Sequence, residues 1–137
     1  MQTDARLREG MNWDDEATIS LDRFLVEWQR ASADSSYHPT IGDSGSDAAG
    51  RFLAALADIE EHEREGVVVV VAHGGVTVDS LRALVGDEAV RSAGASLIDR
   101  GIGCCAITKL RVDDGVATVI GYPSTTHLGD AAEHRPA

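Results

Sequence analysis

The residues best suited to chemistry in this chain are His73 and the two glycines that follow it, Gly74 and Gly75. An imidazole ring has nitrogens that donate or accept hydrogen bonds. Beyond the glycines, apolar residues at helical spacing predict a helix that ends at Gly86. The first turn of a helix presents free backbone N–H groups and the positive end of the helix dipole. We therefore expect an anion to bind beside His73, and phosphate is the leading candidate.

An uninterrupted apolar run, Val67 to Val71, leads into this segment. Five consecutive valines cannot alternate between core and solvent, so they predict a strand buried on both faces, as in the centre of a parallel sheet. Ligands of open α/β sheets bind outside the carboxyl ends of the strands, which is where His73 lies. The sequence thus predicts an α/β fold with an anion site at the end of a central strand.

Apolar spacing, caps and turn residues predict the remaining elements. They are a short helix after Ser20, a helix from Ser44 to Gly66, a loop with a helical turn over 87–102, and a hairpin that turns at Asp114-Gly115. A parallel strand buried on both faces needs a neighbour on each edge, and the chain supplies at most the two strands of the hairpin. A strand that should pair with the valine run is therefore missing from the predicted set.

Length and composition set further limits. A chain of 137 residues with 43% apolar content predicts one domain, at residues 1–128, followed by a polar tail at 129–137. Its 23 acidic residues outnumber its 12 lysines and arginines, and the net charge of −11 argues against nucleic acid and anionic membrane as partners. The apolar run is too short to cross a bilayer, and the first residues do not resemble a signal peptide. We expect a soluble, cytoplasmic protein.

The cysteines and acidic residues do not predict a metal or cofactor site. Cys104 and Cys105 are adjacent, so a disulfide between them would be strained, and we expect reduced thiols that fill the core or a pocket wall. A metal site built on these thiols would need further ligands at workable spacing, and the sequence offers none. Asp113 and Asp114 beside Gly115 are typical of a turn rather than of a calcium loop. We expect neither a metal nor a cofactor.

Several segments of the chain resemble one family. The run from Ala72 to Gly86 resembles the second-histidine motif of the histidine phosphatase superfamily, the phosphoglycerate mutase-like enzymes, including the spacing from the histidine to the glycine that ends the helix. Other segments are similar to further parts of the family and follow in the same order: Leu7-Arg8-Glu9 with Trp13, Gly42-Asp43-Ser44, Cys104-Cys105-Ala106-Ile107-Thr108, and Thr126-His127-Leu128. Together they span nearly the whole chain, which is identified as a member of this superfamily.

The resemblance implies a fold and a set of roles. The implied fold is a three-layer sandwich in which helices flank a mostly parallel central sheet. In the family's reaction a phosphoryl group passes to an imidazole nucleophile, and His73 would hold that phosphoryl group, aided by the N–H groups of Gly74 and Gly75. Glu9 would give a proton to the leaving alkoxide.

The chain also departs from the family pattern. Family members open with a strand that ends in Arg-His-Gly, whose histidine is the nucleophile, and this sequence has no Arg-His-Gly. It therefore resembles the second half to two-thirds of a family member, a partial sandwich missing its N-terminal strand, which explains the unpaired valine run. Asp43 and Ser44 match substrate-pocket positions, although Asp43 replaces the family's glutamate, and Val78 stands where many members carry a basic residue. No arginine, Arg8 included, is assigned to the phosphate clamp.

Two functions follow from these patterns. In the first, the chain is part of a phosphomonoester hydrolase that works through a phosphohistidine on a small phosphate ester, with phosphoglycerate mutase as the alternative within the family. Without the nucleophile, we expect the chain to be inactive alone. In the second, it is a non-catalytic α/β module that binds a phosphorylated ligand or associates with itself. An unpaired apolar strand favours pairing with another chain, so we expect a homo-oligomer joined through the open sheet edge.

Overall fold

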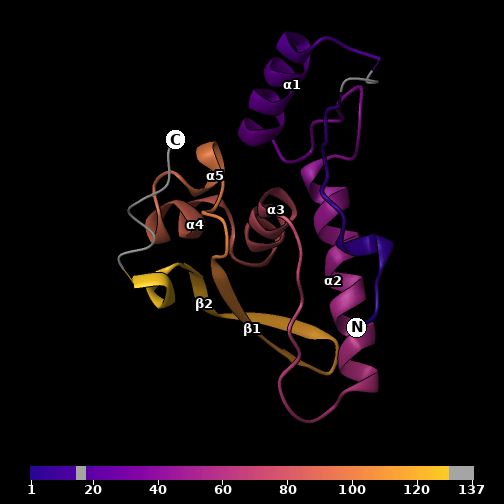
Figure 1. The fold of residues 1–137 in the computed structure, drawn as a ribbon, viewed down its shortest axis with the longest axis vertical. Coiled ribbons are helices and arrows are strands. Elements are labelled where there is room, and N and C mark those ends of the chain that lie inside the picture. The colour runs from indigo at the N-terminus through magenta and orange to yellow at the C-terminus, as the bar shows by residue number, and fades with distance from the viewer. Residues whose placement is uncertain (15–17, 130–137) are drawn as a thin grey trace.

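The computed structural model describes residues 1–14 and 18–129. Its elements are the 3-10 helix η1 (Ala5–Leu7), the helices α1 (Leu21–Ala33), α2 (Gly45–His62), α3 (Gly74–Val85), α4 (Asp87–Ala93) and α5 (Leu97–Arg100), and the strands β1 (Ile107–Asp113) and β2 (Val116–Ser124). Helix α3 lies at the centre of the molecule, between α2 and the pair α4 and α5 (Figure 1). The hairpin of β1 and β2 lies below these helices in this view, and α1 lies at the opposite end.

Local sequence signals explain where the long helices begin and end. Ser20 and Ser44 have extended backbones, and their hydroxyl oxygens accept hydrogen bonds from the backbone N–H three residues later, which confirms both predicted caps. Helix α3 ends at Gly86 as predicted, and the φ of 83° at this position favours glycine. Helix α2 ends at His62 and so stops short of the predicted Gly66.

The core is built on both sides of α3. Phe52 and Leu56 of α2 pack with Val76 of α3, and Leu110 and Val112 of β1 cover this cluster. A second cluster on α3 reaches the next two helices and contains Val78, Leu81, Val90 and Ile98. Because α3 contributes to both clusters, the packing sets the direction in which its N-terminus points.

The segment 87–102 contains more structure than the sequence predicted. Instead of a loop with one helical turn, it forms the short helices α4 and α5. Val90 of α4 is fully buried and Ile98 of α5 nearly so. A helix of seven or four residues is too short to display an apolar stripe, so only its packing against α3 reveals it.

The predicted hairpin is confirmed. Strands β1 and β2 are antiparallel, with Asp113 opposite Val116, so that Asp114 and Gly115 form the two-residue turn. Their φ angles of 50° and 76° are those that a tight hairpin turn of this length requires.

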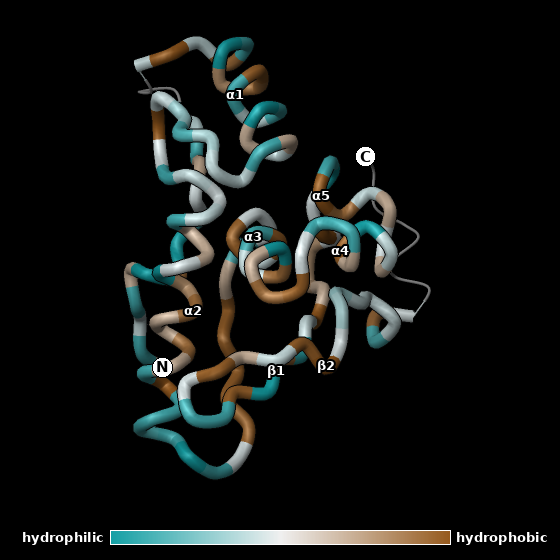
Figure 2. The backbone as a smooth tube through the Cα atoms, turned by 180° about the vertical axis from the view of Figure 1, so that it is seen from behind, coloured by the Kyte–Doolittle hydropathy of each residue, from teal (hydrophilic) through white to brown (hydrophobic). Residues whose placement is uncertain are grey.

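The valine run does not form the predicted buried strand. Residues 67–71 have no strand pairing, and Val67, Val69 and Val71 are 93%, 82% and 85% exposed. Val70 packs against the cluster between α2 and α3. Figure 2 shows the apolar run crossing the hairpin in this view on its way to α3. A strand is held by hydrogen bonds to its neighbours, and within the described residues the run has no neighbouring strand.

The fold class is therefore confirmed only as α/β. The one sheet in the described part of the chain is the antiparallel pair of β1 and β2, and the expected mostly parallel central sheet is not present there. No helix among residues 1–14 and 18–129 is long and apolar enough to span a membrane. The cytoplasmic location stays a prediction, and most of the predicted tail, residues 130–137, lies outside the described residues.

Candidate functional site

Two distant parts of the predicted site meet at the N-terminus of α3. Glu9 Oε2 accepts a hydrogen bond from the N–H of Gly75 at 2.9 Å, and Glu9 Oε1 accepts one from the N–H of Gly10 at 2.9 Å. A Cβ on Gly75 would lie 2.5 Å from Glu9 Oε1, so this close approach requires glycine. The first turn of α3 thus holds an anionic group, as its free N–H groups and dipole favour.

Arg51 of α2 holds the loop that carries Glu9. Its guanidinium donates hydrogen bonds to three carbonyl oxygens of this loop, those of Arg6 at 2.6 Å, Arg8 at 2.7 Å and Glu9 at 3.0 Å. Nε of Arg51 also donates to Asp43 at 3.0 Å. Sequence reasoning missed Arg51. The only signal in the sequence was a single cation beside the apolar stripe of α2. In the structure, only 14% of the Arg51 side chain is exposed.

The structure gives Asp43 and Ser44 different surroundings. Asp43 lines a pocket and forms ion pairs with Arg8 and Arg51, each at 3.0 Å. Ser44 is buried, and its hydroxyl group caps α2. The same hydroxyl group donates a hydrogen bond to the carboxylate of Asp47, in the first turn of α2, at 2.8 Å. Its neighbour Gly45 lines the pocket. The substrate roles of Asp43 and Ser44 stay predictions.

His73 occupies the N-cap position of α3, and its side chain is exposed. Its carbonyl oxygen accepts hydrogen bonds from the N–H and the hydroxyl group of Thr77, at 3.2 and 2.7 Å, while its imidazole makes no capping bond. Gly74 and Gly75, which follow it, line the pocket. His73 and Glu9 therefore lie at the same helix end, and their catalytic roles stay predictions.

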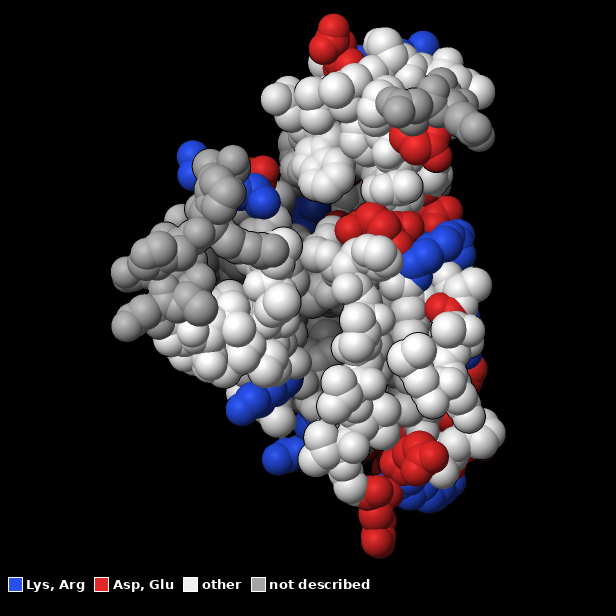
Figure 3. All heavy atoms as spheres, viewed as in Figure 1, with Lys and Arg blue, Asp and Glu red and all other residues white. Residues whose placement is uncertain are grey.

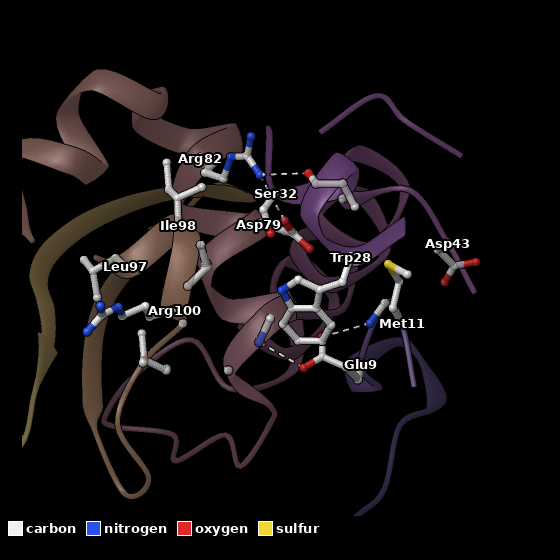
Figure 4. A pocket seen from close by; sticks show the side chains of 18 residues that line it. Glu9, Met11, Trp28, Ser32, Asp43, Asp79, Arg82, Leu97, Ile98 and Arg100 are labelled. Carbon is white, nitrogen blue, oxygen red and sulfur yellow. Dashed lines mark hydrogen bonds and ion pairs between the residues drawn. The ribbon is translucent and has the colours of Figure 1, made fainter. Parts of the chain in front are cut away.

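A pocket of about 270 Å³ opens beside this helix end (Figure 4). Its walls come from α3, from the C-terminal half of α1, from the Glu9 loop and from the region of α5. Trp28 of α1 extends into it, and Asp79 and Arg82 of α3 lie on the side away from Glu9. The volume lies just below the usual range for small-molecule sites, which suits a small ligand.

Asp79 and Arg82 place two charges in a mostly apolar part of α3. Arg82 is 4% exposed, and its guanidinium donates to Asp87 at 2.8 and 3.0 Å, whereas its contact with Asp79 is 3.7 Å long. Burial raises the pKa of Asp79 to about 6; the charge of Arg82 opposes this rise, Glu9 adds to it, Arg51 opposes it and Asp87 adds to it. Sequence reasoning missed both residues, whose signal was a pair of charges within an apolar helical pattern.

The charges around the hollow are mixed. Figure 3 shows acidic and basic side chains side by side around the hollow below α1, and the described residues form no continuous basic patch on this face. This agrees with a net charge of −11. An anion at this site therefore depends on a few local donors rather than on the overall field.

The cysteines differ from their prediction. Cys104 and Cys105 are free, but they are exposed rather than buried in the core, and neither lines the pocket beside α3. The N–H of Ala106 donates to the carbonyl of Gly103 at 3.2 Å, and Cys105 has a φ of 61°, so the pair lies in a tight turn. A turn at the surface exposes both thiols. Within the described ranges, no group of three or more His, Cys, Asp or Glu side chains is placed to hold a metal ion.

Every segment that forms this site lies within the region that matches a known protein family. A family model described as histidine phosphatase superfamily (branch 1) matches residues 1–124. No curated protein and no solved structure matches the chain. The matched region contains the Glu9 loop, the cap of α2 and the N-terminus of α3. On this match, which spans most of its length, the chain belongs to branch 1 of the histidine phosphatase superfamily.

Proposed function

We propose that this chain forms part of a phosphomonoester hydrolase of the histidine phosphatase type that acts on small phosphate esters. The observation that carries the proposal is the hydrogen bond between Gly75 and Glu9, which are 66 residues apart. It brings the family's acid-bearing segment and its second-histidine segment to one helix end, beside a pocket of about 270 Å³. Family membership supports the reaction class.

Each group has a role in the proposed reaction. His73 donates a hydrogen bond to a phosphoryl oxygen, and the amide of Gly74 stabilises the negative charge with it, while the amide of Gly75 holds Glu9 beside them. The bond between phosphorus and the ester oxygen breaks, the phosphoryl group passes to an imidazole nucleophile, and Glu9 in its protonated form gives its proton to the leaving oxygen.

The proposal also assigns the nucleophilic histidine and the missing strand of the sheet to one further segment. Because the sequence has no Arg-His-Gly, the nucleophilic imidazole is assigned to a polypeptide segment outside these 137 residues. A strand of that segment would pair with residues 67–71 and complete a mostly parallel sheet. The exposure of Val67, Val69 and Val71 supports this pairing, since these side chains are apolar and no strand of the described residues pairs with their backbone.

Binding of inorganic phosphate tests the site directly. We expect phosphate to bind, as measured by isothermal titration calorimetry, and His73→Ala to weaken its affinity at least about tenfold, since a hydrogen bond to a charged group contributes ~1.5–3 kcal/mol. His62→Ala is the matched control, because His62 is exposed on α2 and its Nδ1 lies 2.7 Å from the Asp58 carbonyl oxygen. Unchanged phosphate affinity in His73→Ala would count against the proposal.

Hydrolysis of a model substrate distinguishes the hydrolase from the second candidate, a non-catalytic binding module. The absence of Arg-His-Gly from the sequence favours that second candidate. We expect no release of nitrophenolate from p-nitrophenyl phosphate by the chain alone. With excess free imidazole as the nucleophile, we expect release by the wild type and none by His73→Ala. Release without imidazole that is lost in His73→Ala would place the nucleophile in this chain. Phosphate binding without release under either condition would favour the binding module.

A further inference from the structure

The pocket continues past the proposed phosphate site along one face of α3. Gly75, Asp79 and Arg82 are spaced four and three residues apart, so they lie on the same side of the helix. All three line the pocket. Asp79 lies one helical turn beyond the amide of Gly75, at a rise of about 6 Å along the axis. A ligand held by the first turn of α3 therefore has a carboxyl group within reach of its other end.

Asp79 is a largely buried carboxylate whose charge is only partly compensated. Its side chain is 19% exposed, and its one ion pair among the described residues is the 3.7 Å contact with Arg82. Arg82 makes two shorter bonds to Asp87, so its charge is shared. A Cβ on Gly45 would lie 2.7 Å from Asp79 Oδ1, so the carboxylate fits closely against the start of α2. A further cation in the pocket would stabilise the ionised form of Asp79.

Trp28 supplies an aromatic surface in the same pocket. Its indole ring extends from α1 into the pocket and lies between Asp79 and Glu9 in this view (Figure 4). Phe24 contacts Trp28 edge to face, with ring centroids 6.1 Å apart, which restricts the orientation of the indole. The face of an indole ring attracts cations more strongly than the face of any other aromatic side chain does. Together the carboxylate and the ring suit a positively charged nitrogen.

We propose that the substrate of this pocket is a phosphate ester whose alcohol carries an ammonium group, and that Asp79 and Trp28 select for that group. The inference rests on the proposed function, which puts the phosphate at the N-terminus of α3. In O-phosphoethanolamine, phosphorus and nitrogen are separated by four bonds and lie about 5 Å apart when extended, a span of the same order as the roughly 6 Å rise from Gly75 to Asp79. The ammonium also offsets the negative charge that Glu9 and Asp79 present to a phosphate.

A matched pair of ligands tests this selection. O-phosphoethanolamine and n-propyl phosphate have nearly the same shape, and only the first ends in an ammonium group. Well above pH 6, we expect the wild type to bind O-phosphoethanolamine about tenfold more tightly, and Asp79→Asn to bind the two ligands equally. Asp99→Asn is the control variant and is expected to keep the preference, because Asp99 is an exposed carboxylate of α5 that pairs with Arg91 at 3.3 Å.

The pH dependence of this preference is a second readout. We expect the preference to disappear as the pH falls below about 6, because Asp79 then takes up a proton. The charged groups that face Asp79 are Arg82 of its own helix, Glu9 of the N-terminal loop, Arg51 of α2 and Asp87 of α4. The ammonium lowers the pKa of the phosphate in its own molecule, so the two ligands do not titrate alike. The readout is therefore the difference in pH dependence between the wild type and Asp79→Asn, and a merely structural role for Asp79 would leave the two pH profiles alike.

The outcomes separate this inference from the proposed function. Equal affinity of the wild type for both ligands, or a preference that survives Asp79→Asn, overturns the inference and leaves the proposed function standing. Failure of the wild type to bind either ligand or inorganic phosphate contradicts both. Retained binding of n-propyl phosphate shows that a variant keeps its site. Should Asp79→Asn fail to fold, Trp28→Leu provides the same comparison, and an undiminished preference in that variant overturns the inference.

Discussion

Among single residues, glycines make the close approaches on which the site depends. Gly75 lets the carboxylate of Glu9 reach the first turn of α3, because a side chain there would occupy the same space. Gly42, with a φ of 93°, lets the N–H of the next residue, Asp43, donate to the carbonyl of Gly10 at 2.9 Å. These contacts set the distances between segments that are far apart in the chain.

Alanine at position 75 tests the first of these contacts. Gly75→Ala places its Cβ 2.5 Å from Glu9 Oε1, so the carboxylate of Glu9 must shift and we expect its hydrogen bond to the amide at position 75 to be lost. We expect the free energy of unfolding to fall by about 1–3 kcal/mol, the cost of leaving a partly buried hydrogen bond unmade. Urea unfolding curves measure this change.

Gly50→Ala is the matched control for that substitution. Nothing lies within 4 Å of a Cβ at this position of α2, so helix propensity alone is expected to raise the free energy of unfolding by about 0.5–1 kcal/mol. If Gly75→Ala proved as stable as the wild type, Glu9 would not be anchored at α3 in solution.

At the scale of elements, helices and hairpins form from local signals, whereas a lone strand depends on its neighbours. A helix satisfies its own backbone groups, so the caps at Ser20 and Ser44 suffice to start α1 and α2. A hairpin brings its own partner strand, joined here at Asp114-Gly115. The run 67–71 has neither device, and in the described chain it stays unpaired although its residues strongly favour a strand.

The exposed valines lead to a prediction about association. Exposed apolar side chains on an unpaired backbone offer a template for another chain, so we expect the purified chain to form dimers or larger species. Val69→Lys is expected to shift it toward the monomer, because a charge opposes edge pairing. Size-exclusion chromatography with light scattering measures both.

The control for Val69→Lys is Val116→Lys. Val116 is 66% exposed at the hairpin turn, outside the run 67–71, so lysine there is expected to leave the association unchanged. A wild-type chain that is monomeric and unfolds cooperatively would contradict the prediction.

In the molecule as a whole, net charge and local chemistry act against each other. A net charge of −11 disfavours the approach of any phosphate ester. The N-terminus of α3 is a local exception, and its amide at Gly75 already holds the carboxylate of Glu9. A substrate that carries its own positive charge lowers this electrostatic cost, which is consistent with an ammonium group as the second recognition element.

The sequence was enough to predict the superfamily, the caps of α1 and α2, the hairpin turn and the start of α3. Each depends on residues a few positions apart: serine before a helix, Asp-Gly between alternating strands, His-Gly-Gly before an apolar helical pattern. Motif order along the chain added the family, which the match to residues 1–124 confirms. The short helices α4 and α5 were not predictable, because only burial of Val90 and Ile98 against α3 distinguishes them from loop.

By itself, then, the amino-acid order determined the superfamily, the long helices, the hairpin and which residues are candidates for chemistry. Only the tertiary structure decided that Glu9 reaches Gly75, that Arg51 holds the Glu9 loop, that Asp79 is buried beside the pocket, and that the valine run stays exposed. The physical reason is distance. Hydrogen bonds, burial and strand pairing act between atoms within a few ångströms, and which distant residues come that close depends on the packing of α2, α3 and the hairpin.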